Sequence, residues 1–197
     1  GSEMCIRDSV DIAGLVKGAS KGEGLGNKFL ANIRNTNAII HVLRCFENDN
    51  ITHVDGSIDP VRDKGIIDTE LQLKDLETIE NRLAKTQKQA VVGGDKQAKR
   101  AVEILLQYKA VLEQGLSART VELEKEDRKL VADLNLLTDK PVLYVCNVDE
   151  KSAVTGNAYT EAVKAAIAGE KAEMLVVAAA TEADIAELES YEERQMF

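Results

Sequence analysis

The chain has no tryptophan, and aromatic residues make up only 4% of its 197 positions. It has two prolines and three cysteines, and it contains no apolar run of about 18 residues, the length that a membrane-spanning helix needs. We therefore expect an aliphatic core and no contact with a membrane. Cys5, Cys45 and Cys146 are odd in number and far apart, which is typical of reduced thiols in a cytoplasmic protein rather than of a disulfide framework.

Positive charge is also scarce, because 34 acidic residues outnumber 25 basic ones and leave a net charge of -9. This excludes binding of nucleic acid through a global positive field, so any such contact needs a local cluster of cations. The first nine residues lack the basic stretch and apolar run of a secretory signal. We interpret residues 1–9 as a foreign or disordered leader, with Gly1-Ser2 as a cleavage scar.

Apolar stretches rich in β-branched residues predict four strands, at residues 10–12, 38–46, 141–146 and 174–180. Continuous apolar runs with helical segments between them are typical of parallel strands covered on both faces. The expected fold class is therefore α/β with a largely parallel sheet. The glycine-rich residues 16–27 are expected to form a mobile loop, followed by a short helix through Arg34, and further helices are expected at residues 159–168 and 182–193.

The middle of the chain has a helical pattern instead. Apolar residues recur at three- and four-residue spacings over residues 68–90 and again over 95–112, with Thr86 as one polar break. Gly93 and Gly94 can end the first helix and Asp95 can cap the second. The pair should fold back as an antiparallel coiled-coil hairpin, and a third helix, at about residues 123–134, should return the chain to the sheet.

Asp11 and Gly14, in the stretch Asp-Ile-Ala-Gly, directly follow the first predicted strand. In P-loop nucleotidases an aspartate at this place holds magnesium through water, and the glycine amide meets the terminal phosphate. Aspartate and glycine also end many strands and turns that bind nothing. The glycine-rich loop and the helix that follow favour the nucleotide interpretation.

A second candidate loop, Asn147-Val148-Asp149-Glu150, follows the strand at residues 141–146. Base-reading loops of GTPases occupy this place with the pattern Asn-Lys-x-Asp, whose aspartate accepts hydrogen bonds from two donors of guanine. Here valine replaces the lysine and glutamate replaces the aspartate, which weakens the case for guanine because adenine presents a different set of donors and acceptors. A plain acidic turn after a strand is the alternative.

A third candidate, the small residues Ala179 and Ala180, comes at the end of the last predicted strand. Such residues match a loop that packs under the base in nucleotide-binding folds of this type. The same letters also fit an ordinary strand end followed by a helix that Thr181 would cap.

The stretches DIAGLVKGASKGEGLGNKFLANIR, HVLRCFENDNITHVDGSIDP and NVDE together resemble the YchF or Obg-like ATPase family, over about residues 10–189. The resemblance implies a P-loop ATPase of the GTPase superclass with a G-type domain, a coiled-coil insertion and a carboxy-terminal TGS domain. It also implies ATP and magnesium as cofactors, a preference for ATP over GTP, and a cytoplasmic protein linked to ribosomes. By resemblance, Leu15 stands where related enzymes have a water-orienting glutamine, Asp11 serves magnesium through water, and the nucleotide contacts are Gly14, Asn147, Val148, Glu150, Ala179 and Ala180.

Two parts of that family pattern do not occur in the sequence. No GxxxxGK[ST] phosphate loop is present, and the chain ends at Phe197 without a TGS domain. We therefore expect an amino-terminally truncated fragment that binds nucleotide weakly or not at all and is catalytically inactive. In the family fold a missing first strand would lie beside the strand at 38–46, so we expect residues 10–12 to pair directly with that strand, or two chains to associate across the gap.

The expected domains are an incomplete nucleotide-binding domain over residues 10–65 and 138–197, and a helical hairpin insertion over residues 66–137. At the tip of this hairpin six cations gather around one acid, Asp95, although the whole chain is acidic. Such a cluster suits contact with the ribosome or ribosomal RNA, although a solvated coiled-coil tip would have the same composition. The six are Arg82, Lys85, Lys88, Lys96, Lys99 and Arg100.

Two functions remain open on the sequence. The first is an ATPase of the YchF type, of which this chain is a part that does not hydrolyse nucleotide by itself. The alternative is a helical-hairpin binding module that contacts the ribosome or RNA through its basic tip and has no enzymatic activity. A fragment with no activity at all is the third interpretation.

Overall fold

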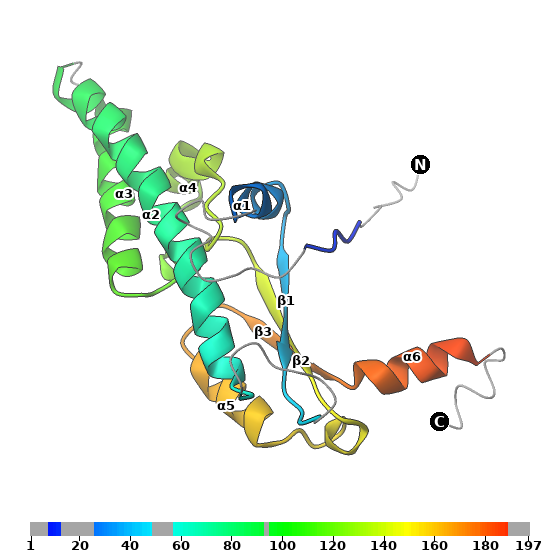
Figure 1. The fold of residues 1–197 in the computed structure, drawn as a ribbon. Helices are drawn as coiled ribbons and strands as arrows, with labels where there is room; N and C mark the ends of the chain where they lie inside the picture. The colour runs from blue at the N-terminus through cyan, green and yellow to red at the C-terminus, as the bar shows by residue number, and fades with distance from the viewer. Residues whose placement is uncertain (1–7, 13–25, 49–56, 93–94, 189–197) are drawn as a thin grey trace.

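The computed structural model describes residues 8–12, 26–48, 57–92 and 95–188, and it confirms the α/β class (Figure 1). A small sheet lies at one end, and two long helices, α2 and α3, project from it side by side. The elements are, in chain order, α1 (Gly26–Arg34), β1 (Ile39–Arg44), α2 (Pro60–Val92), α3 (Lys96–Glu113), η2 (Ala118–Thr120), α4 (Lys125–Val131), η3 (Ala132–Leu134), β2 (Val142–Asn147), η4 (Glu150–Ser152), α5 (Ala158–Ile167), β3 (Glu173–Val177) and α6 (Ala179–Glu187).

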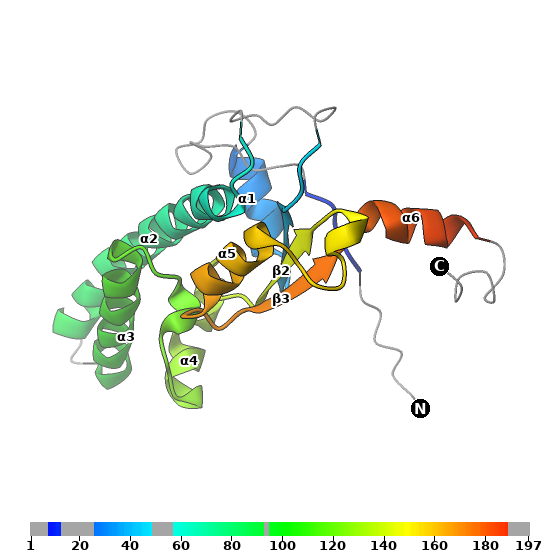
Figure 2. The ribbon, with the colours of Figure 1, turned by 90° about the horizontal axis from the view of Figure 1, so that it is seen from below.

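The sheet consists of three parallel strands in the order β1-β2-β3. Figure 2 shows α2 and α5 on one side of this sheet and α6 leading away from it. The covered face buries Leu43, Tyr144 and Cys146 against Val163 of α5. The prediction of cover on both faces is wrong for the described part of the chain, because apolar side chains on the opposite face stay exposed: Ile40 at 62%, Val42 at 61% and Leu175 at 50%.

The short first strand predicted at residues 10–12 does not form. These residues have no strand structure, Val10 is 65% exposed, and β1 pairs only with β2 among the described residues. The predicted direct pairing with the strand at 38–46 is therefore wrong. Three residues offer too few backbone hydrogen bonds to offset the entropy of fixing an edge strand, and Ile12 instead packs beside Leu30 and Leu137.

The helix α2 begins earlier than the apolar periodicity predicts. Asp59 caps it, because its Oδ1 accepts a hydrogen bond from the backbone N–H of Arg62 at 2.9 Å, and Pro60 is the first helical residue. An acidic cap followed by proline is a strong helix-start signal, since proline lacks only an N–H that would have no helical partner there. The predicted start near residue 68 missed this signal. The 66–137 domain boundary itself stays a prediction.

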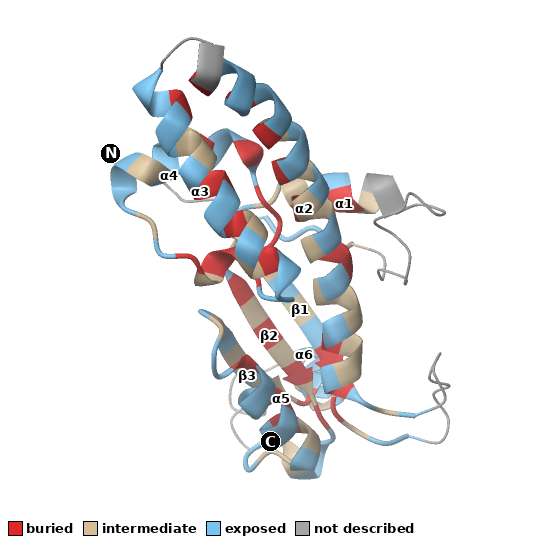
Figure 3. Cartoon of the chain, turned by 90° about the vertical axis from the view of Figure 1, so that its left-hand side faces the viewer, coloured by how far each residue is buried: buried red, intermediate tan, exposed pale blue. Residues whose placement is uncertain are grey.

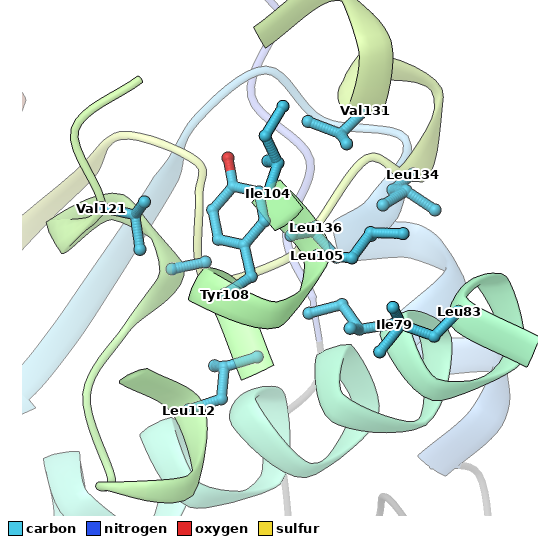
Figure 4. Close-up of a cluster of buried hydrophobic side chains, with 11 residues drawn as sticks. Ile79, Leu83, Ile104, Leu105, Tyr108, Leu112, Val121, Val131, Leu134 and Leu136 are labelled. Atoms are coloured by element: carbon cyan, nitrogen blue, oxygen red, sulfur yellow. The ribbon is translucent and has the colours of Figure 1, made fainter. Parts of the chain in front are cut away.

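The hairpin has its own apolar core, which Figure 4 shows in close-up. Ile79 and Leu83 of α2 face Leu105 of α3, as the spacing predicts. Ile104 and Tyr108 are also fully buried, because α3 packs against α4 and the segment after it as well as against α2. The polar break Thr86 is accommodated because its hydroxyl donates to the carbonyl oxygen of Arg82 at 2.9 Å.

Most other element boundaries agree with the sequence, apart from the last helix. Asp95 caps α3 by accepting from Gln97 N, and Gly115 follows the helix with φ +75. The strand predicted at 174–180 ends at Val177, and helix α6 already begins at Ala179. Gly93, Gly94 and residues 189–193 lie outside the described residues.

Two buried polar groups hold the hairpin to the sheet. The carboxylate of Asp75, fully buried in α2, accepts hydrogen bonds from Leu137 N at 2.8 Å, Thr138 N at 2.7 Å and Thr138 Oγ1 at 2.7 Å. Lys64, near the start of α2, pairs with Asp68 at 2.5 Å and with Glu170 after α5. Figure 3 shows buried positions both in the sheet and along the long helices, and the buried apolar side chains of the described residues form three clusters.

Candidate functional site

The carboxyl ends of β2 and β3 meet at one edge of the sheet, because the two strands are parallel neighbours. In open α/β sheets ligands bind outside this edge. Two of the predicted loops lie side by side here: Val148 N donates to Val177 O at 2.9 Å, and Ala179 N donates to Asn147 Oδ1 at 3.1 Å. The second bond joins the Asn-Val-Asp-Glu loop to the small-residue loop.

The Asn-Val-Asp-Glu loop is locally fixed. Asp149 caps the short helix η4 by accepting from Ser152 N at 3.2 Å, and Glu150 begins that helix with its side chain exposed. The Val148 side chain is instead buried in the core beneath the sheet, 4% exposed. Any contact of Val148 with a ligand would therefore come from its backbone.

Residues next to β1 and α5 support the Asn-Val-Asp-Glu loop through a second set of hydrogen bonds. Cys45 N donates to Asn147 O at 2.8 Å, and Asn157 Nδ2 donates to Cys45 O at 2.7 Å. Asn157 also caps α5 in a reciprocal box with Thr160. Sequence reasoning missed this supporting asparagine, although the spacing Asn-x-x-Thr before an apolar run could have found it.

The two cysteines beside this loop are free thiols, buried and in contact with each other. Hydrogen bonding to Cys146 and burial raise the pKa of the Cys45 thiol. Cys45 is therefore protonated at neutral pH and behaves as a core residue, which agrees with the reduced thiols expected from the sequence. Cys5 lies outside the described residues.

The edge offers complementary hydrogen-bonding groups for a flat heterocycle. Because Asn147 Oδ1 accepts from Ala179 N, its Nδ2 is left as a donor. Glu150 adds an exposed acceptor, and Ala179 and Ala180 are also exposed. These groups suit a ligand with both donor and acceptor atoms, and adenine has an exocyclic amine donor and ring-nitrogen acceptors.

The phosphate side of the predicted site is not assembled by the described residues. Asp11 is exposed, while Gly14 and Leu15 lie outside the described residues. Within the described ranges no group of three or more His, Cys, Asp or Glu side chains could hold a metal ion. In the same ranges no helix is both long and apolar enough to span a membrane.

Among the described residues, the basic hairpin tip divides into arginines that form ion pairs and lysines that do not. Arg82 binds Asp133, and Arg100 binds Asp127 at 2.5 Å and Glu103 at 2.7 Å. Hydrogen bonding to Arg82 lowers the pKa of Asp133, which is the expected effect of a cation beside a carboxylate. The two arginines therefore brace the hairpin against α4 and the segment after it.

The other four predicted cations face solvent. Across the described ranges, none of them lies within ion-pair distance of a carboxylate. The hairpin thus presents a lysine surface whose charge is not cancelled by its own neighbours. We call it the lysine surface; it consists of Lys85, Lys88, Lys96 and Lys99.

Comparison with known proteins identifies the family of this chain. No family model matches it. The ribosome-binding ATPase YchF of Bacillus subtilis is 52% identical over 189 residues, covering 95% of this chain and 51% of the relative. The protein of the same name from Haemophilus influenzae is 50% identical over 183 residues, covering 93% of this chain and 50% of the relative. The chain belongs to the YchF family.

A solved structure supports the assignment independently of the two sequences above. The Schizosaccharomyces pombe YchF GTPase superposes with a TM-score of 0.77 and 32% sequence identity, covering 93% of this chain and 50% of that chain. The chain therefore spans about half the length of the YchF relatives it matches. The names of these relatives differ in the nucleotide, ATP for the bacterial proteins and GTP for the yeast one.

Proposed function

We propose that this YchF-family chain supplies the base-binding edge of an ATP site together with a helical hairpin that contacts the ribosome. One observation carries the first half: Asn147 is fixed to Ala179 at the carboxyl edge of the sheet, beside the exposed carboxylate of Glu150. The bacterial relatives are named ribosome-binding ATPases, which supports both halves. A protein that works on ribosomes would act in the cytoplasm.

Glu150 favours adenine over guanine in this proposal. Its carboxylate can only accept, so it pairs with the exocyclic amine of adenine, and Asn147 Nδ2 pairs with a ring-nitrogen acceptor. At the place of Glu150, GTPases carry an aspartate that accepts from two guanine donors. The longer glutamate side chain changes where the carboxylate lies, which leaves guanine donors without a matched acceptor.

Magnesium and phosphate would be served by Asp11 and Gly14, with Leu15 in the place of a water-orienting glutamine. A leucine cannot orient water by hydrogen bonding, so another group must do so in the YchF enzymes. The printed sequence contains no GxxxxGK[ST] loop, whose amides, lysine and hydroxyl hold the phosphates and magnesium. We propose that the 197-residue chain by itself does not hydrolyse ATP.

Titration with a fluorescent ATP analogue tests the base site. We expect ATP to compete better than GTP, and Glu150→Ala to weaken binding about tenfold, as the loss of a hydrogen bond to a charged group does. Glu161→Ala, which removes an exposed carboxylate from α5, is the matched control and should bind as the unaltered chain does. Equal competition by the two nucleotides, or steady magnesium-dependent turnover of ATP, would contradict the proposal.

The lysine surface carries the second half of the proposal. Four cations without carboxylate partners in the described chain, at the far end of a long hairpin, can reach phosphates that the acidic body would repel. Arg82 and Arg100 are excluded from this role because their charges are already paired. A purely hairpin-based binding module without enzymatic activity is the alternative that this surface supports.

Cosedimentation with ribosomes tests the hairpin. Lys85→Glu with Lys88→Glu should weaken binding strongly, whereas Lys151→Glu with Lys164→Glu changes the net charge equally but on the sheet end and should not. Losing each phosphate contact should lower the slope of log affinity against log salt by about 0.9. Equal weakening by both double variants would show that only net charge matters and would refute a contact at the tip.

Self-association through the sheet is a further part of the proposal. The exposed Ile40 and Val42 lie on β1, an edge strand of the three-stranded sheet, and such an edge can pair with a second chain. Light scattering should then detect dimers that Val42→Lys abolishes, while the exposed Leu106→Lys on α3 leaves them intact. A monomer at all concentrations would eliminate this part alone.

A further inference from the structure

A polar cavity lies at the amino ends of β1 and β2, at the opposite end of the strands from the base loops. Its volume is about 500 Å³, it is open to solvent, and it is lined by the end of α1, by α3 and by the segment from α4 to β2. Its lining combines three cations and one carboxylate, that of Asp139, with asparagine amides and an aromatic ring. The residues that matter here are Arg34, Asn37, Tyr108, Arg128, Asn135 and Lys140.

Two of the three cations make hydrogen bonds only to neutral acceptors in the described structure. Arg34 donates to Leu134 O at 3.1 Å and to Thr78 Oγ1 at 3.3 Å. Lys140 Nζ donates to Thr36 O at 2.5 Å. Within the described ranges neither has a carboxylate within ion-pair distance, whereas Arg128 pairs with Asp139 at 3.1 Å.

The positive charge in this cavity is not balanced by nearby acids. Asp139 is matched by Arg128, and the oxygens of Asp75, the other carboxylate in electrostatic reach, already accept bonds from Leu137 and Thr138. Counting Asp75 as ionised still leaves three cations against two acids. Burial, and then the charge of Arg34, lower the pKa of Lys140, while the charges of Asp75 and Asp139 oppose this shift.

Both cations keep unused donors. A guanidinium has five N–H groups and an ammonium has three, so Arg34 and Lys140 can each form further bonds. An anion with several acceptor oxygens would fill these donors and relieve the repulsion between the two cations. Tyr108 and Leu136 give one apolar part of the lining, and Asn37 and Asn135 supply amide groups.

We propose that this cavity binds the phosphate group of a small phosphorylated molecule, with Arg34 and Lys140 as its anchors. Its volume lies within the range of small-molecule pockets, which is about 300 to 1,000 Å³. The site lies between the hairpin root and the sheet, since Arg34 also holds Leu134 and Thr78, so a bound phosphate would tighten the contact between the two.

Isothermal titration with inorganic pyrophosphate, in the absence of magnesium, tests the site on the full 197-residue chain. We expect saturable binding that Lys140→Gln weakens at least tenfold, because a charge-assisted hydrogen bond is lost. Lys164→Gln, on the exposed side of α5, is the control of equal charge and should leave the affinity unchanged. Asn147→Ala should also leave it unchanged, which separates this cavity from the base loops.

Arg34→Gln should weaken the binding of pyrophosphate as well. Circular dichroism shows whether this variant is still folded. If it unfolds, the result for Lys140→Gln decides the test. A single-stranded RNA oligonucleotide forms the second arm. Binding of RNA without binding of pyrophosphate, loss of pyrophosphate binding in Asn147→Ala, or equal losses in Lys140→Gln and Lys164→Gln would each overturn the proposal.

Discussion

At the scale of single residues, the most consequential group is the buried carboxylate of Asp75. It accepts hydrogen bonds from two backbone N–H groups and one hydroxyl, on a segment more than 60 residues further along the chain. Burial raises the pKa of Asp75, while the bonds from Thr138 and Leu137 oppose this rise. Asp75 thus provides hydrogen-bond acceptors for the backbone N–H groups of Leu137 and Thr138, which water cannot reach.

Asp75→Ala should lower the free energy of unfolding by about 2 to 5 kcal/mol, because it leaves buried N–H groups without acceptors. Urea unfolding followed by circular dichroism measures this. Glu77→Ala, on the same helix but exposed, should cost less than about 1 kcal/mol. Similar losses for the two variants would show that Asp75 is not a structural acceptor.

His41 on β1 gives a second prediction, about pH. Burial lowers its pKa from the ordinary value of 6.5; the charges of Asp68, Asp63 and Glu170 oppose this and that of Lys64 adds to it. As pH falls below about 6.5 the unfolded chain takes up the proton first, so stability is present above this pH and is lost toward acid. The slope cannot exceed about 1.4 kcal/mol per pH unit for one proton.

His41→Gln removes this group, so the difference in unfolding free energy between the two chains should shrink as pH falls from 7.5 toward 5. Parallel urea titrations across that range measure the difference. Contact with the Tyr144 ring, 5.6 Å between centroids, is lost at every pH and contributes only a constant. A difference that does not change with pH would contradict the assignment.

At the scale of elements, the start of helix α2 is determined by its capping residues as well as by the spacing of its apolar residues. The spacing alone places the first hairpin helix at residues 68–90, whereas the Asp59 cap and Pro60 extend it back to residue 60. The extension matters because it contains Lys64, which forms an ion pair with Glu170 after α5. The first turn of α2 therefore connects the hairpin to the body of the protein.

Asp59→Ala should destabilise the chain by about 0.5 to 2 kcal/mol, the usual cost of removing an acidic helix cap. Hydrogen exchange should show faster opening confined to the first turn of α2. Gln89→Ala, exposed near the other end of the same helix, should leave both measurements unchanged. Faster exchange along the whole of α2 would show instead that the cap controls the entire helix.

At the scale of the whole molecule, the hairpin and the sheet are joined by a buried ion network. Lys64, whose side chain is only 8% exposed, bridges Asp68 and Glu170, and Glu170 also accepts from the Tyr144 hydroxyl at 3.1 Å. The network ties α2, β2 and the end of α5 together. It should make the two parts unfold as one unit.

Lys64→Met should destabilise the chain by about 3 to 5 kcal/mol, because Asp68 stays buried without its cation and Glu170 keeps only the longer pair with Arg119 at 3.6 Å. Unfolding followed at the hairpin and at the sheet by hydrogen exchange should no longer coincide. Lys74→Met, which breaks an exposed pair with Glu77, is the matched control and should cost less than about 1 kcal/mol. Coincident transitions in Lys64→Met would show that apolar packing alone couples the two parts.

The sequence by itself determined the α/β class, the three longer strands, the helical hairpin and the family, because apolar periodicity and short motifs are local in the chain. It also predicted that the loops after the strands at 141–146 and 174–180 lie side by side, since parallel strands must end at the same edge. It failed at residues 10–12, where strand-forming residues have no neighbour to pair with, and at α6, where a run of alanines fits strand and helix equally.

Only the tertiary structure decided how charges and buried groups are shared between distant segments. It paired Arg82 and Arg100 with acids of the α4 region, and so reduced the predicted basic tip to four lysines. It also brought Arg34 and Lys140 together in the lining of one cavity, although they lie 106 positions apart in the sequence. A sequence shows how many charges a segment carries, but their partners depend on distances in space, and electrostatic energy depends on those distances.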